Sequence, residues 1–333
     1  MIRFEEQTEQ EAGFAALWDR HIAPGLGQYS RHYTKAFLLL AVGWTLLIAI
    51  FLAVVWIYQK EEAPIIFGLN GQNIIAVVAI VGAGLGYAAY LPFKKLTKSK
   101  QASFKTAIDD HFQDHLTPID DLERINAAVE DLHSRKILPK NNPSVKAAYQ
   151  SRDQLYRFYN VTFTQTRSSG NQTRQENIHY LVLEMTLERS LSSEIRILTD
   201  DALENFFRRL FRRGSNVRLA NNEFEKLFEV FSNDPELVNE IFTPDLQQNF
   251  VDMQNYFFTS SSRWTGSRRI TAGLKGNTFS LAIHGLDDVA GQKLAIQSPK
   301  KLVQSARTAI RRMHEVMEIV ETLRDVMPII KRP

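Results

Sequence analysis

The chain of 333 residues contains no cysteine. This absence excludes disulfide bonds, thiolate nucleophiles, cysteine-ligated zinc sites and iron–sulfur clusters. The net charge is also small, because 40 basic and 37 acidic residues give +3. A dedicated nucleic-acid-binding protein usually carries a much larger basic excess, so we expect no nucleic-acid partner.

Motifs for catalysis and cofactor binding are also missing. No serine sits in a G-x-S-x-G elbow, and no P-loop occurs. The glycine-rich stretch at 82–86 does not complete a dinucleotide-binding fingerprint, because Tyr87 stands where the third glycine is required. We therefore expect no cofactor, and nothing in the sequence indicates an enzyme.

Two long runs without charge are present instead. Residues 36–58 form a helix of about 34 Å, enough for a hydrocarbon core of roughly 30 Å. Residues 73–93 form a second such run. A secretion signal would be shorter and nearer the start of the chain. The runs predict a two-helix transmembrane hairpin over 35–93; the alternative is a pair of buried core helices.

Basic residues flank this expected hairpin on its outer sides. Arg31 and Lys35 precede the first span, and the second is followed by Lys94, Lys95, Lys98, Lys100 and Lys105. Positive charge favours the cytoplasmic side. We therefore expect a multi-pass protein with both termini cytoplasmic and the lipid bilayer as a partner.

Small residues recur along the two runs at four-residue spacing. The positions are Ala41, Thr45, Ala49 and Ala53 in the first run, and Ala79 with Ala83 and Gly82 with Gly86 in the second. Such spacing places each set on one helical face, where small side chains allow close helix packing. The faces form either a seam between copies of the chain or the contact between the two spans.

The remainder predicts an α+β cytosolic domain attached to the transmembrane hairpin. We expect an N-terminal amphipathic helical segment over 1–34, a juxtamembrane helical region over 94–159 and the α+β domain over 160–333. The helical region includes a helix over 144–159. Helices and strands are segregated rather than strictly alternating, which favours α+β.

Within the expected domain the pattern alternates at 160–166, 179–189 and 194–198, which predicts strands. Residues 269–285 predict two strands joined at Lys275, Gly276 and Asn277. A long helix is predicted over 299–326, with an apolar side made of Leu302, Ala306, Ala309, Met313, Val316, Met317, Val320 and Leu323.

Residues 224–253, FEKLFEVFSNDPELVNEIFTPDLQQNFVDM, followed by the alternating pattern at 270–284, resemble a bacterial family known only as a domain of unknown function. Phe14, Leu17 and Trp18 resemble its N-terminal F-x-x-L-W-like helix. The resemblance implies two adjacent spans, a cytosolic α+β domain and a place in the bacterial inner (cytoplasmic) membrane. It implies no catalytic residue.

Two histidines offer a weak candidate metal site. His111 and His115 lie four residues apart in an expected helix, a spacing that can hold a metal ion. A zinc-protease motif would need glutamate at position 112, where phenylalanine stands. Asp110 and Asp114 repeat the spacing, so the alternative is a solvated polar face.

Two arginine clusters are candidates for binding an anionic ligand such as a lipid headgroup. They consist of Arg208, Arg209, Arg212 and Arg213, and of Arg263, Trp264, Arg268 and Arg269. Arginine beside tryptophan suits an interfacial contact or a stacked anion. The alternative is a solvated helix face and a loop.

These features lead to two main hypotheses for function, beside a third, an enzyme whose site assembles from scattered residues, which no motif supports. The first is a membrane-anchored cytosolic interaction or scaffold module that binds a protein partner or self-associates. The second is a sensor or binder of an anionic ligand through the arginine clusters.

Overall fold

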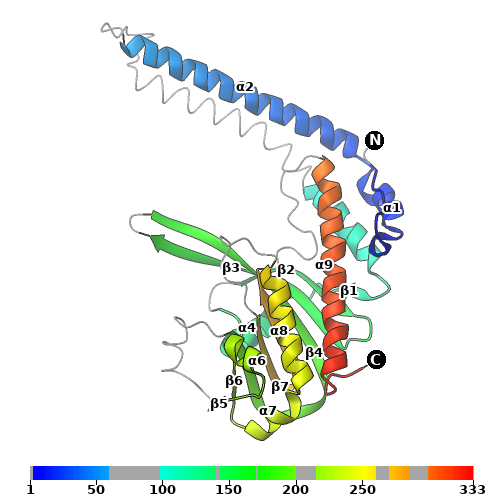
Figure 1. Cartoon of the computed structure of the whole chain (residues 1–333). Helices are drawn as coiled ribbons and strands as arrows, with labels where there is room; N and C mark the ends of the chain where they lie inside the picture. The colour runs from blue at the N-terminus through cyan, green and yellow to red at the C-terminus, as the bar shows by residue number, and fades with distance from the viewer. Residues whose placement is uncertain are drawn as a thin grey trace. The chain divides into compact units, whose positions relative to one another are not determined.

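The structure is a computed structural model, and it describes residues 3–59, 98–139, 143–169, 172–199, 215–259, 270–285 and 299–332 (Figure 1). The chain divides into two compact units. The first comprises residues 1–107 and 293–307, and the second comprises residues 108–292 and 308–333. Each unit is described by itself.

The first unit is built around aromatic side chains from the start of the chain. Short helical turns follow one another at η1 (Glu9–Glu11), α1 (Phe14–Leu17) and η2 (Trp18–Ile22). Their rings meet at Phe4, whose centroid lies 4.9 Å from that of Phe14 and 5.6 Å from that of Trp18. Arg307 closes the cluster, with its guanidinium over the Phe4 ring at 5.3 Å. Burial of these large rings holds the segment in place.

A buried lysine ends the helical segment at η2. Lys100, which is 8% exposed, donates from Nζ to the carbonyl oxygen of Ile22 at 3.0 Å and to that of Pro24. A cation at the carboxyl end of a helix satisfies carbonyls that have no partner within the helix. Burial lowers the pKa of Lys100. Gly25 follows with φ of +81°, a conformation that glycine adopts without strain.

The first uncharged run lies in α2 (Leu26–Gln59), which begins ten residues earlier in a polar segment. No helix in the described part of the chain is long and apolar enough to cross a membrane. A hairpin also needs two helices, and the second predicted span, 73–93, lies outside the described residues. The predicted transmembrane hairpin and the multi-pass inner-membrane location with cytoplasmic termini are therefore wrong on this evidence.

The second unit contains an antiparallel sheet of seven strands. Its order is β1 (Leu116–Pro118), β2 (Pro143–Ser151), β3 (Tyr156–Ser169), β4 (Gln172–Thr199), β6 (Phe228–Ser232) and β5 (Ser215–Val217), and β7 (Ile270–His284) also pairs with β4. The α+β class of this unit is thus as predicted.

Strand β4 is the central strand of this sheet, because it is 28 residues long and has partners on both edges. It pairs with β3 from Gln172 to Met185, with β7 from Tyr180 to Ile197 and with β6 from Ile195 to Thr199. The β4–β7 register shifts between Thr186 and Ile195. Such irregularities bend and twist a sheet.

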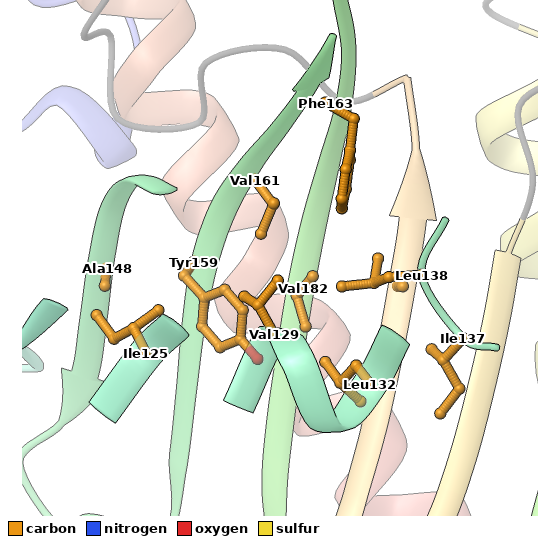
Figure 2. Close-up of a cluster of buried hydrophobic side chains, with 11 residues drawn as sticks. Ile125, Val129, Leu132, Ile137, Leu138, Ala148, Tyr159, Val161, Phe163 and Val182 are labelled. Carbon is orange, nitrogen blue, oxygen red and sulfur yellow. The ribbon is translucent and has the colours of Figure 1, made fainter. Parts of the chain in front are cut away.

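Helix α4 (Leu122–Ser134) covers one face of the sheet (Figure 2). Asp121 caps its start, since the Asp121 carboxylate accepts a bond of 3.1 Å from the Arg124 N–H. The buried core beneath it consists of Ile125, Val129, Leu132, Ile137, Leu138, Ala148, Tyr159, Val161, Phe163, Val182 and Ala282. Because alternate residues of a strand point to opposite faces, β3 contributes Tyr159, Val161 and Phe163 together.

The opposite face is buried as well, with Phe158, Leu181 and Leu281 at most 2% exposed. Helix α9 (Pro299–Val326) passes behind the sheet in Figure 2. Its bounds match the predicted helix. All the predicted apolar positions are buried except Met317, which is half-buried.

The end of α9 is fixed to the turn between β2 and β3. Arg324, 6% exposed, lies 3.5 Å from Asp153 and places its guanidinium over the Tyr156 ring at 5.3 Å. Burial raises the pKa of Tyr156 to about 12, so its phenol stays protonated at neutral pH. Ile330 then forms a bridge to Leu187 of β4. These contacts tie the last turn of α9 and the C-terminal residues to the sheet.

A phenylalanine cluster supports the end of the sheet at β6. It joins α6 (Asn222–Leu227), β6, α7 (Pro235–Ile241) and α8 (Pro244–Thr259). The rings of Phe224, Phe228, Phe242 and Phe250 lie with neighbouring centroids 5.0 to 6.3 Å apart. Asn221 and Asp234 cap α6 and α7 through bonds to backbone N–H groups.

Two sequence-based assignments differ from the structure. The predicted helix at 144–159 is wrong, since these residues form β2 and the start of β3 and pair with each other across a turn. Sheet pairing here overrides the local pattern. The predicted hairpin at 269–285 is one continuous strand, β7, in which Gly276 has φ of +57° and marks a shift in register.

We predict that Gly273→Ala destabilises the second unit. A Cβ at Gly273 would lie 2.5 Å from Cδ1 of Ile137 and 2.7 Å from Nη2 of Arg135. Arg135 cannot easily move, because its Nε bonds Glu194 at 2.9 Å. We expect a loss of about 1–3 kcal/mol in the free energy of unfolding, as for other overpacked sites, measured by urea denaturation.

The control is Ile137→Val, which removes the Cδ1 atom that the new Cβ would meet. In a double-mutant cycle, Gly273→Ala should cost less in the Ile137→Val background than in the natural chain. Equal costs in both backgrounds would contradict a steric origin.

Candidate interaction site

Most sequence-predicted site residues lie outside the described part of the chain. This holds for both arginine clusters, Arg208, Arg209, Arg212, Arg213, Arg263, Trp264, Arg268 and Arg269, and for the small residues Ala79, Gly82, Ala83 and Gly86. The anionic-ligand hypothesis that rests on the arginine clusters thus stays a prediction.

The small residues of the first run lie on α2. Ala41, Thr45 and Ala49 are exposed, and Ala53 belongs to the same helix. The Thr45 hydroxyl donates to the carbonyl oxygen of Ala41 at 2.8 Å, so it is satisfied within the helix. Larger apolar side chains are exposed nearby, namely Phe37, Leu38, Val42, Ile48 and Leu52.

The two candidate metal ligands do not share a helical face. Residues 98–111 are helical and the helix ends at His111, whereas His115 lies in the following turn and is exposed. The His111 ring instead packs edge-on against Phe112, and its centroid lies 6.4 Å from that of His314. No group of three or more potential metal ligands occurs among the described residues.

A two-stranded extension of the sheet is the candidate interaction site. Strands β3 and β4 stay in register as far as Ser169 and Gln172. Pairing between β2 and β3, however, ends at Phe163, and pairing between β7 and β4 ends at Tyr180. We call residues 164–169 and 172–177 the β-arm. In Figure 1 it projects from the rest of the sheet.

Aromatic rings hold the base of the β-arm. Phe163, 1% exposed, contacts Tyr180 edge-on with centroids 5.5 Å apart, and Tyr180 lies 5.0 Å from His284 of β7. Polar cross-strand pairs follow at the same level. Thr162 lies 3.0 Å from Nδ1 of His179, and the Thr164 hydroxyl donates to the Asn177 amide oxygen at 3.1 Å. The base is therefore part of the core, and the β-arm extends from it.

Composition separates the β-arm from the strands that carry it. Its two segments, TQTRSS and QTRQEN, contain no apolar residue. The register places Arg167 opposite Arg174 and Gln165 opposite Glu176. Like charges in directly opposite positions destabilise a strand pair, and an isolated two-stranded ribbon is marginally stable in water. Core packing therefore does not account for this sequence.

A buried polar cluster also lies within the sheet. Arg157 and Glu184 form an ion pair of 2.5 Å. Glu184 is also the register partner of Ser280, which is fully buried. Burial, followed by the Glu184 charge, raises the pKa of nearby Tyr159 well above its usual value, so this phenol stays protonated. The cluster lies across β3, β4 and β7 within the sheet and favours a structural role.

The sequence does not predict the β-arm, because its centre, SSGNQT, is typical of a loop. The alternation at 160–166 was visible, and Gly170-Asn171 suits a two-residue connection between strands. Apolar alternation, the usual sign of a strand, stops at Phe163. A register that continues through polar residues leaves no such sign.

Residues 179–325 match the model of a family described as a protein of unknown function, DUF3137. This match supports the predicted resemblance to an uncharacterised domain family. No curated protein matches the chain. Among solved structures, the chain is similar to the crystal structure of the mycobacterial trehalose monomycolate transport factor A, TtfA, at 8% identity and a TM-score of 0.25, over 70% of this chain and 98% of that one. At that TM-score the similarity carries no argument.

We predict that Phe163→Ala loosens the base of the β-arm. Removing a fully buried phenylalanine ring costs about 3–5 kcal/mol in comparable cores, and we expect that loss in urea unfolding. Phe163→Leu should cost less, because it keeps most of the buried volume.

Thr164→Val is the neighbouring control. It changes one exposed position beyond the core and should stay within about 0.5 kcal/mol of the natural chain. A similar loss for Thr164→Val and Phe163→Ala would show that the core does not end at Phe163.

Proposed function

We propose that this chain is an interaction module that binds a protein partner through the β-arm. The pairing of β3 with β4 supports this proposal. It continues for six pairs beyond Phe163, which is the last residue of β3 that pairs with another described strand. A ribbon without a single apolar residue is best explained by a contact outside its own domain.

Strand geometry favours binding through the backbone. In a strand, backbone N–H and C=O groups point to both edges, and a two-stranded ribbon satisfies one edge of each strand. No described strand pairs with the outer edges of the β-arm, so an incoming strand can add there, which is a recognised mode of peptide binding. This mode needs no apolar groove, which agrees with the polar composition.

The first test removes the β-arm and leaves the sheet. Deleting residues 164–169 and 172–177 joins Phe163 to Ile178 through Gly170 and Asn171. Each strand loses six residues, an even number, so the alternation of faces is kept. Tagged chains would be captured from the native cell extract, and the recovered proteins measured by quantitative mass spectrometry. A true partner should fall by about tenfold or more with the shortened chain, equivalent to about 1.4 kcal/mol.

The matched control exchanges two register partners, Ser168→Thr with Thr173→Ser, and keeps both length and composition. It should recover the partner at the natural level. The purified partner should then bind the full chain directly. Equal recovery with and without the β-arm would refute the proposal.

Self-association through α2 is a second candidate. Leu38, Ala41, Thr45, Ile48 and Leu52 follow one another at spacings of three and four residues, and all five are exposed. This spacing is the seam pattern of paired helices, and its small members allow close approach. A second copy of the chain, packed through the same seam, would cover these residues.

The chain lacks cysteine, so one introduced thiol reports on this seam. We predict that Thr45→Cys in the full chain forms a disulfide-linked dimer under mild oxidation, seen on a non-reducing gel. Disulfides require Cα atoms within about 7 Å.

Gly43→Cys is the control, because two residues turn a helix by about 200° and place it away from the seam. Among the described residues, no atom lies within 4 Å of a Cβ built at Gly43. Equal crosslinking at both positions, or none at position 45, would contradict the seam.

A further inference from the structure

We infer that the partner segment bound by the β-arm is acidic and extended, and that it adds as a strand along an outer edge with carboxylates beside Arg167 and Arg174. This inference rests on the proposed function and specifies the chemistry of the partner. Three features carry it: the edges, the charges and the lack of apolar residues.

The edges define where a strand can add. On the β3 side, pairing with β2 stops where Pro143 meets Phe163. On the β4 side, pairing with β7 stops where His284 meets Tyr180. Beyond these points the two strands of the β-arm have only each other as strand partners in the described chain. An incoming strand can therefore continue the line of β2 or of β7.

The charges define what the incoming strand carries. The backbone register makes Arg167 and Arg174 partners, so two arginines occupy opposite positions of the ribbon. Glu176 is the single acidic residue of the β-arm and is paired with Gln165 instead. Carboxylates on a third strand at that level would attract both arginines and offset the repulsion between them. Guanidinium groups bind carboxylates through paired hydrogen bonds.

The other occupants fit less well. A partner with an apolar groove finds no apolar residue in the β-arm. Edge-to-edge pairing with the β-arm of a second copy would gather four arginines near one level. Nucleic acid would use the charges and leave the backbone edges unused, and the whole chain carries only +3.

The test uses fluorescent ten-residue peptides and the purified full chain. The probe alternates threonine and glutamate, which favours an extended strand with carboxylates on one face. One control probe replaces glutamate by lysine. Another alternates proline and glutamate, and it keeps the charge but cannot form a strand ladder. A duplex DNA of about 20 base pairs tests the nucleic-acid alternative.

Binding would be measured by fluorescence anisotropy for four chains: natural, without the β-arm, Arg167→Gln with Arg174→Gln, and Arg167→Lys with Arg174→Lys. The threonine–glutamate probe should bind the natural chain and weaken by roughly fivefold with glutamine, in line with two lost cross-strand charge pairs. The lysine variant should bind with an affinity between those of the natural chain and the glutamine variant, because it keeps the charge but cannot form the paired hydrogen bonds. The chain without the β-arm should lose binding. The lysine and proline probes should bind weakly.

Several results would overturn the inference. Equal binding of the proline probe would show that charge alone is recognised. Tighter binding of duplex DNA that depends on both arginines would identify a nucleic-acid element instead. Unchanged binding by the glutamine variant, with loss on deletion of the β-arm, would remove the acidic specificity and leave the proposed function intact. Absence of binding by any peptide would remove strand addition.

Discussion

The arrangement of strands in the second unit depends on β4, which pairs with other strands along both of its edges. A strand of 28 residues cannot stay in one flat sheet with all its partners, and β3, β7 and β6 meet it over different parts of its length. The register shifts between Thr186 and Ile195 let β4 and β7 bend together. Where β3 and β7 both pair with β4, residues 181–185 are buried on both faces of the sheet.

The same constraint produces the β-arm. Residues 172–177 of β4 extend beyond β7, and β3 follows them although β2 has ended. The stability of this extension comes from its base, where Phe163, Tyr180 and His284 are in contact, because a lone ribbon is marginal in water. A rigid base with a polar extension presents its edges at a fixed distance from the domain.

Part of this architecture could be predicted from the sequence. Helix α9 was predicted with its bounds, since a proline start and a regular apolar side identify a long helix without tertiary information. The sequence predicts strands at 179–189 and 194–198. It does not predict that they belong to one strand, because the residues between them do not alternate regularly. Residues 144–159 were misassigned because alanine and tyrosine at 147–149 fit a helix locally, whereas β3 supplies their partners.

The interaction site was the hardest feature to predict, for a physical reason. Sequence patterns identify a strand through its apolar residues, and the β-arm has none, so its residues resemble a loop. The uncharged run in α2 led to an error of the opposite kind, in which a strong signal predicted a structure that is not found. Its hydropathy suggested a transmembrane hairpin, which the described helices do not support. The β-arm is identified by its register and not by its composition. Six successive pairs of β3 and β4 continue where no other described strand does. Folding stability alone does not explain a strand pair that has no apolar residue and has two arginines in opposite register positions. Such local conflicts are expected where a surface is built for a partner.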